Sequence, residues 1–126
     1  MNRKVLLIED EPNITEAIRF LLTRDGWQVE THEDGTTAVN KVSESRPDLV
    51  ILDLMLPGKS GMDILREVRE LDGMERLPVL MLTARGQSRD RDMAEKAGVS
   101  RFMTKPFSNT EVLTAVRDLH AQASRT

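Results

Sequence analysis

The fold is decided by the stretch Leu49-Val-Ile-Leu-Asp53-Leu-Met-Leu-Pro-Gly-Lys-Ser-Gly61, in which an apolar run stops at a carboxylate and then turns at Pro57 and Gly58. An unbroken apolar run of this kind favours a strand that is covered on both faces, as in parallel sheets. Asp53 would then lie at the carboxyl end of a buried strand. Ligands of open α/β sheets bind in the crevice outside these ends, so Asp53 is a candidate functional residue. An Asp at this position can also simply end a strand or cap a loop.

Four further segments have the composition of strands, at residues 4–9, 27–32, 77–83 and 99–104. Helical spacing of apolar residues is found between and after them, within residues 14–22, 36–45, 64–71, 88–97 and 112–119. This alternation predicts a parallel sheet with right-handed crossovers and helices on both faces. We therefore predict an α/β fold, a flavodoxin-like doubly wound sheet of five parallel strands in the order 2-1-3-4-5, with five helices. Its switch-point crevice would lie between the first and third strands.

Local signals place several helix ends. Capping-box spacing occurs at residues 13–16 and 108–111, and Ser60 is placed to cap the helix that follows it. Gly26 and Gly73 lie just beyond predicted helix ends. The segment 88–97 is highly charged, so we expect the least firmly held helix there, with three residues to bury: Met93, Ala94 and Ala97.

The 126 residues fit one domain, which we divide into a globular part of residues 1–121 and a short polar tail of residues 122–126. Lys and Arg number 18 against 21 Asp and Glu, interspersed along the chain, which disfavours direct binding of nucleic acid or of an anionic membrane. The absence of cysteine from the sequence excludes disulfides, thiolate metal sites and thiol nucleophiles. The apolar run after the basic start is too short for a signal peptide or a membrane span, so we expect a cytoplasmic protein.

Polar side chains follow the predicted strand ends. Glu9 and Asp10 leave the first strand and Asp53 leaves the third, and these strands are neighbours in the predicted order. Two like charges about 4 Å apart cost on the order of 4 kcal/mol at an effective dielectric of about 20, so the cluster needs a cation or a raised proton affinity. Oxygen ligands alone suit Mg²⁺. Thr83 and Lys105 would add a hydroxyl and an ammonium, which completes the groups used in phosphoryl transfer.

Each of these residues alone also fits an ordinary structural role. Residues 9–11 could form a solvated acidic turn, Thr83 could cap a helix, and Lys105 could be a surface charge. Their coincidence at four strand ends favours a site. His32 and His120 lie on different predicted elements without a third nitrogen or sulfur ligand, and we expect both to be exposed.

The motifs at these positions are specific. They are Val5-Leu-Leu-Ile-Glu-Asp-Glu-Pro12 with the acidic pair, Leu52-Asp-Leu-Met-Leu-Pro-Gly58, Leu82-Thr-Ala84, and Thr104-Lys-Pro-Phe107. With them the chain resembles the response-regulator receiver domains of two-component signalling, and in particular the single-domain receivers of the chemotaxis-regulator kind. The resemblance covers about residues 4–119.

The resemblance implies that Asp53 accepts a phosphoryl group from a sensor histidine kinase or a histidine phosphotransfer protein. It implies that Mg²⁺ is the cofactor, held by Asp10, Asp53 and the main-chain carbonyl of Met55, with Glu9 acting through a metal-bound water. A protein of this family is a signalling phosphoacceptor that assists its own phosphorylation and dephosphorylation, and is not an enzyme in the usual sense.

The resemblance also implies roles for residues around the acids. Thr83 and Lys105 would bind the oxygens of the acyl phosphate, and the Lys105–Pro106 bond is usually cis in the family. Met55 and Arg85 occupy the positions that tune dephosphorylation. Neither side chain offers a carboxylate or amide to orient water, which predicts a long-lived phosphoryl group.

A switch follows from the same resemblance. A phosphoryl group adds about −1.5 to −2 charge, which would draw Thr83 inward, and Phe102 takes the position of the family's switch aromatic. The fourth helix, fifth strand and fifth helix would form the surface for a downstream protein partner. Receivers that dimerise ahead of DNA-binding domains usually carry acids just before that aromatic. This chain has Ser100 and Arg101 there, although residues 54–58 resemble that class.

Three other functions are weighed as alternatives. A pseudo-receiver, held in one state and regulated by a partner, is disfavoured by the complete set of Asp10, Asp53, Thr83 and Lys105. A Mg²⁺-dependent phosphatase of the haloacid-dehalogenase type also forms an aspartyl phosphate, but it normally needs a second acid where Met55 stands. A flavodoxin is weaker still, because no Ser/Thr/Gly-rich phosphate loop follows the first strand.

Overall fold

The structure is a computed structural model that describes residues 3–84 and 88–124. Arg85 lies outside the described residues. Five parallel strands form one sheet in the order β2-β1-β3-β4-β5, which confirms the predicted topology. The strands are β1 (Arg3–Ile8), β2 (Trp27–His32), β3 (Leu49–Asp53), β4 (Val79–Thr83) and β5 (Arg101–Thr104).

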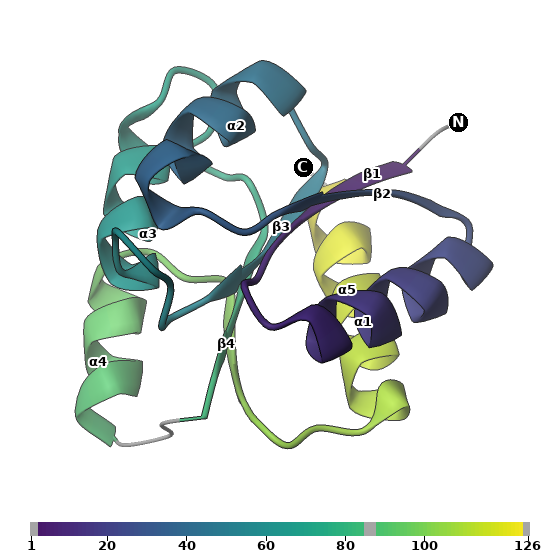
Figure 1. The fold of residues 1–126 in the computed structure, drawn as a ribbon. Helices are drawn as coiled ribbons and strands as arrows, with labels where there is room; N and C mark the ends of the chain where they lie inside the picture. The colour runs from purple at the N-terminus through teal and green to yellow at the C-terminus, as the bar shows by residue number, and fades with distance from the viewer. Residues whose placement is uncertain (1–2, 85–87, 125–126) are drawn as a thin grey trace.

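Helices cover both faces of this sheet. They are α1 (Pro12–Arg24), α2 (Ala38–Ser45), α3 (Gly61–Glu70), α4 (Ser88–Lys96) and α5 (Asn109–Ser124), with a short 3-10 helix, η1 (Gly35–Thr37), before α2. Figure 1 shows α2, α3 and α4 on one side of the strands and α1 and α5 on the other. This is the doubly wound arrangement that the alternation of strands and helices predicts. Helix α5 runs to Ser124, three residues into the segment expected to be a polar tail.

The central strand β3 is buried on both faces, as its apolar run predicts. Val50 and Leu52 join the core cluster that contains residues of α2, α3 and α4. Leu49 and Ile51 join the second cluster, which contains residues of α1 and α5. A strand anchored in two cores is a rigid support for the residue at its end, which is Asp53.

The predicted helix caps have different outcomes. Helix α5 carries the predicted capping box, because the Glu111 amide donates to Ser108 Oγ at 3.1 Å and the Ser108 amide donates to Glu111 Oε1 at 2.9 Å. The Ser60 cap of α3 is also present, with its hydroxyl accepting from the Asp63 amide. The prediction of a capping box at residues 13–16 is wrong. Helix α1 begins at Pro12, whose fixed φ suits a first helical position, and the N-cap Glu11 makes no side-chain cap.

Two expectations about burial are also corrected. Met93 of α4 is 41% exposed, and Ala94 is the buried residue of that helix. Burying a single alanine leaves α4 with little packing, in line with the weakly held helix expected there. The two histidines are half-buried instead of exposed. The His32 ring lies 2.7 Å from Thr37 Oγ1, and the His120 ring packs edge-on against Trp27.

Candidate functional site

Four strands deliver polar residues to one edge of the sheet, as predicted. Asp53 and Thr83 are the last residues of β3 and β4, while Glu9 and Lys105 directly follow β1 and β5. Backbone hydrogen bonds hold the two flanking residues in place, because the Glu9 amide donates to the His32 carbonyl and the Lys105 amide donates to the Thr83 carbonyl. The Lys105–Pro106 bond is cis, as expected.

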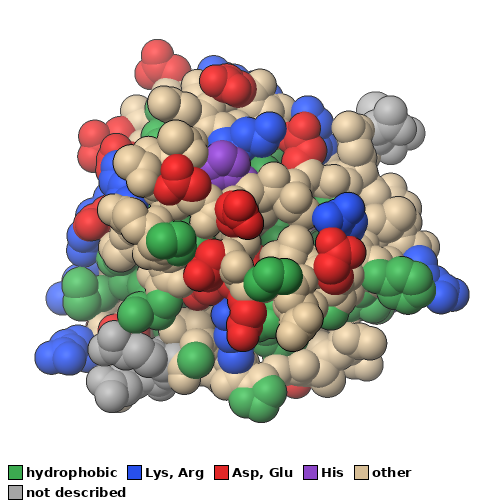
Figure 2. All heavy atoms as spheres, in the orientation of Figure 1, with side chains coloured by type: hydrophobic (Ala, Val, Ile, Leu, Met, Phe, Trp, Pro, Cys, Tyr) green, Lys and Arg blue, Asp and Glu red, His purple; other side chains and the backbone are tan. Residues whose placement is uncertain are grey.

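Three carboxylates meet at this edge. Glu9, Asp10 and Asp53 each place an oxygen so that all three oxygens lie within 4.8 Å of one another. Glu9 and Asp53 are buried, with 2% and 4% of their surface exposed, while Asp10 is exposed. Several Asp and Glu side chains gather near the centre of the face drawn in Figure 2, where β1 ends in Figure 1. The cluster is therefore rooted in the protein and open to solvent on the Asp10 side.

Lys105 reaches into the cluster. Its Nζ donates to Glu9 Oε1 at 2.9 Å and to Asp53 Oδ2 at 3.2 Å, and its side chain is 15% exposed. Burial alone would lower the pKa of Lys105, but its hydrogen bonds and ion pairs with the two acids outweigh burial and raise it. Lys105 is thus a fixed cation that balances part of the charge of the three carboxylates.

The pKa of Glu9 is raised by its surroundings in this cluster. Burial is the main cause that raises its pKa to about 7, and the neighbouring Asp53 carboxylate adds to the shift. Lys105 and the Glu11 amide, which donates to Glu9 Oε2 at 3.2 Å, oppose the shift only in part. A buried carboxyl with a pKa this far above its ordinary value, next to a second acid, is typical of functional sites.

The Asp53 carboxylate is held at both oxygens. The Met55 amide donates to Oδ1 at 3.0 Å, and Lys105 donates to Oδ2. The bond from Met55 is the Asx turn that a loop-capping Asp also makes. The bond from the Lys105 ammonium is charge-assisted and comes from the end of another strand, which a loop-capping Asp does not require. The Met55 side chain is 52% exposed beside it.

The donor set fits a magnesium ion. Hard carboxylate oxygens gather within reach of one another, Lys105 offsets part of their charge, and Asp10 opens the group to solvent. Mg²⁺ prefers oxygen ligands and keeps several waters, which an open acidic edge permits. These residues therefore match the metal predicted from the sequence.

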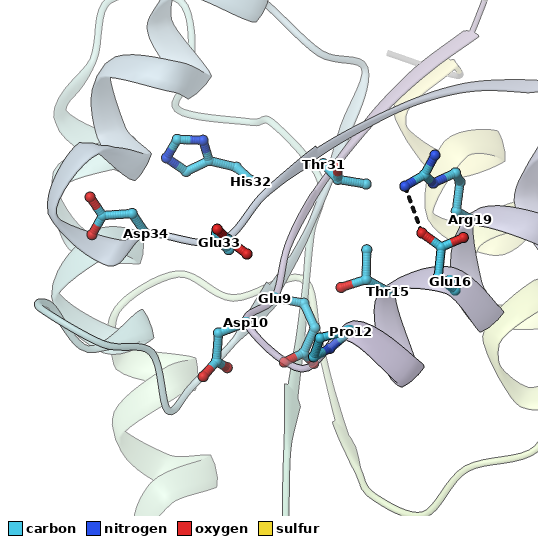
Figure 3. A pocket seen from close by; sticks show the side chains of 10 residues that line it. All are labelled: Glu9, Asp10, Pro12, Thr15, Glu16, Arg19, Thr31, His32, Glu33 and Asp34. Carbon is cyan, nitrogen blue, oxygen red and sulfur yellow. Dashed lines mark hydrogen bonds and ion pairs between the residues drawn. The ribbon is translucent and has the colours of Figure 1, made fainter.

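A cleft lies beside the acids between α1 and the end of β2 (Figure 3). Glu9 and Asp10 form one wall of it. Glu16 and Arg19, on the α1 side, pair with each other at 2.7 Å. The His32 side chain lies on the α2 side of the cleft, away from Glu9 and Asp10 (Figure 3). The cleft thus gives solvent access to the Glu9 and Asp10 side of the cluster.

The predicted switch residues, Thr83 and Phe102, lie on the neighbouring strands β4 and β5. Thr83 is fully buried at the end of β4, next along the chain from the residue that pairs with Asp53 in the sheet. Phe102 is half-buried on β5, and the Arg91 guanidinium of α4 lies 5.1 Å from its ring centre. The aromatic ring therefore contacts the helix that buries a single residue.

Two contacts of the site were missed in the sequence. The pairing of Lys105 with Glu9 joins residues 96 positions apart, and no local pattern signals it. The close contact of Gly35 with the loop after Asp53 was also missed, although the Asp34-Gly35 pair is visible as a turn.

The family model described as "Response regulator receiver domain" matches residues 5–117. The phosphate regulon transcriptional regulatory protein PhoB of Escherichia coli is 39% identical over 117 residues, which are 93% of this chain and 51% of that protein. The chain thus spans about half the length of this curated relative.

Solved structures agree with this match. The receiver domain of the sensor histidine kinase PA1611 of Pseudomonas aeruginosa, with a magnesium ion coordinated in its active-site cleft, superposes with a TM-score of 0.87 at 29% identity. The match covers 96% of this chain and 99% of that one. The chemotaxis protein CheY4 of Vibrio cholerae gives a TM-score of 0.88 at 27% identity, covering 94% and 99%. Among the helices within residues 3–84 and 88–124, none has the length and apolar character needed to cross a membrane.

Proposed function

This chain belongs to the response regulator receiver family, a family of signalling domains, and we propose that Asp53 is its phosphoacceptor. The phosphoryl group would come from the phosphohistidine of a sensor histidine kinase or of a phosphotransfer protein. The observation that carries this proposal is the Asp53 carboxylate itself, which is buried at a strand end, held by Met55 and Lys105, and grouped with two further acids.

The proposed transfer moves the phosphoryl group from a nitrogen of the donor to an oxygen of Asp53. A bond forms between an Asp53 oxygen and phosphorus while the N–P bond of the phosphohistidine breaks. The imidazole nitrogen keeps the electron pair of that bond and takes up a proton. The chain would hold the nucleophilic carboxylate in one orientation. It would also place the Lys105 ammonium and the Thr83 hydroxyl where they can donate hydrogen bonds to the phosphoryl oxygens.

Mg²⁺ would be held by Asp10, Asp53 and the main-chain carbonyl of Met55, with Glu9 acting through a bound water. When bound, the ion neutralises charge on phosphoryl oxygens and on the clustered acids. The magnesium ion in the cleft of the PA1611 receiver domain supports this assignment.

The lifetime and the output of the phosphorylated state are also proposals. Met55 and Arg85 offer no water-orienting carboxylate or amide, so we infer slow loss of the phosphoryl group. The output surface would consist of α4, β5 and α5, where Phe102 contacts Arg91 and α4 is weakly packed. A downstream protein in the cytoplasm would bind there, and residues 1–121 would form the receiver domain.

The test is the intact mass of the protein after incubation with Mg²⁺ and acetyl phosphate. The wild type should gain one phosphoryl group and Asp53→Asn should gain none, while Asp63→Asn, an exposed acid on α3, serves as the matched control and should gain one. A wild type that stays unmodified under these conditions, and shows no amide shifts with beryllofluoride, would indicate the pseudo-receiver. Rapid loss of the adduct in Mg²⁺ buffer would contradict the slow dephosphorylation.

A further inference from the structure

The loop after Asp53, residues 54–60, lies directly against the turn formed by residues 34–37. Gly35 in this turn is buried, and its amide donates to the Pro57 carbonyl at 3.1 Å. A Cβ atom at Gly35 would come within 2.8 Å of the Pro57 oxygen and 2.9 Å of the Lys59 nitrogen, and closer still to the Lys59 oxygen. Backbone therefore meets backbone here, with no space for a side chain.

The contact is mutual. Gly58 of the loop has a φ of +85°, and a Cβ atom on it would overlap the Thr36 hydroxyl. Thr36 is itself fixed, because its amide and its hydroxyl both donate to Asp34 Oδ1, at 3.0 and 2.9 Å. Because neither Gly35 nor Gly58 has a side chain, the loop and the hydrogen-bonded turn can pack in direct backbone contact.

The start of the loop is anchored separately. The Leu54 amide donates to the Leu82 carbonyl of β4 at 2.8 Å, and the Leu54 carbonyl accepts from the Gly61 amide at 2.8 Å. Met55 lies between this anchor and the contact with Gly35. Its main chain already binds Asp53 Oδ1, so a displacement of the loop at Pro57 to Lys59 would act on the Asp53 site through Met55.

We propose that Gly35 is a positioning residue for the site: by seating the turn 34–37 against the loop 54–60, it sets the position of the Met55 main chain and so the affinity for Mg²⁺. This inference rests on the proposed function, because it takes the Met55 carbonyl as a metal ligand. It adds a residue from a different crossover, before α2, that touches neither the metal ligands nor the phosphoacceptor in the contacts described.

Two glycines separate the effect of this contact from the effect of backbone strain. Gly35 is not among the positive-φ glycines, so alanine fits its backbone and adds only the steric contact. Gly73 has a φ of +80°, and the nearest atom to a Cβ there is an Arg46 side-chain nitrogen at 3.6 Å. Gly73→Ala therefore adds backbone strain without a contact at the loop, and is the matched control.

The experiment is an amide NMR titration of the full chain with Mg²⁺. Gly35→Ala should weaken the magnesium affinity by about tenfold or more, as the loss of groups that orient metal ligands does. It should also shift the Met55 amide resonance before any metal is added. Gly73→Ala should lower the melting temperature and leave the magnesium affinity unchanged.

A second pair of variants covers the case in which Gly35→Ala does not fold. Gly58→Ala should weaken magnesium binding, and Thr36→Ala in the same chain should restore part of it by removing the hydroxyl that the new methyl group meets. Wild-type affinity in folded Gly35→Ala, or in Gly58→Ala, would overturn the inference and leave the proposed function intact. A wild type that does not bind Mg²⁺ would instead contradict the metal site of the proposed function.

Discussion

The two ends of the sheet handle charge in opposite ways. At the carboxyl end, Glu9 and Asp53 are buried and share one lysine, and the pKa of Glu9 is raised to about 7. At the amino end, Asp25 pairs with Arg117 at 2.5 Å, and the Arg117 side chain is 58% exposed. There the hydrogen bond from Arg117 is the main cause that lowers the pKa of Asp25.

This difference indicates that the charged pair at the amino end of the sheet stabilises the fold. The Asp25 pair joins α5 to the residue after α1 at the surface, where its carboxylate gains from being charged. The acids at the carboxyl end are held in an arrangement that makes one of them resist ionisation. Unfavourable electrostatics kept in a rigid frame are typical of functional sites, because a ligand cation or a phosphoryl transfer can use them.

The largest expected effect is at Lys105. Lys105→Met keeps the apolar stem and removes the charge that offsets two buried carboxylates, so the metal-free protein should lose about 3 kcal/mol of unfolding free energy at pH 8. Arg117→Met, the matched change at the amino end, should cost much less, because Arg117 is exposed and pairs with one half-buried acid, whereas Lys105 offsets two buried ones. Urea unfolding of both variants measures the difference. Equal losses would contradict the contrast between the two ends.

A smaller effect should appear in the pH dependence of stability. Because the folded pKa of Glu9 is raised from 4.5 to about 7, its contribution is fully present below pH 4.5 and is lost as pH rises through about 7. The loss should be about 2 kcal/mol, below the full value of the shift because interacting ionisable groups do not titrate independently. Urea unfolding without metal at pH 5 and pH 8 measures it. Glu9→Gln should remove this part of the pH dependence, and parallel profiles for the two proteins would rule it out.

Much of this comparison could be foreseen from the sequence. Apolar runs that stop at Asp53 and Thr83 predict the strands and the edge where the polar residues meet, because parallel strands place their carboxyl ends together. The strand order follows from the flavodoxin-like arrangement that suits this alternation of strands and helices. The resemblance also supplied Lys105–Pro106 as a cis bond. These features depend on local pattern and on topology, which a sequence carries directly.

Features that depend on packing were not foreseen. The start of α1 was misplaced because Asn13 and Glu16 have capping-box spacing, while Pro12 is a better first helical residue. Helical spacing alone places Met93 in the core, yet α4 turns it toward solvent. The contact of Gly35 with residues 57–59 depends on two crossovers meeting in space, and no spacing within either segment reveals it.

The smallest expected effect is at the amino end and has the opposite sign with pH. Because the folded pKa of Asp25 is lowered from 3.8, mainly by the hydrogen bond from Arg117, the pair stabilises the fold above about pH 4. This contribution is lost as pH falls through the folded pKa, the reverse of the behaviour of Glu9. Asp25→Asn should therefore cost stability at pH 7 and little at pH 3, as measured by urea midpoints. Salt should reduce the difference, since the Arg117 side chain is open to solvent and screening acts on exposed pairs, whereas the buried Glu9 effect should persist. A salt-insensitive loss in Asp25→Asn would mean that this pair behaves like the buried one, and the contrast between the two ends would then lie in the number of acids and not in their burial.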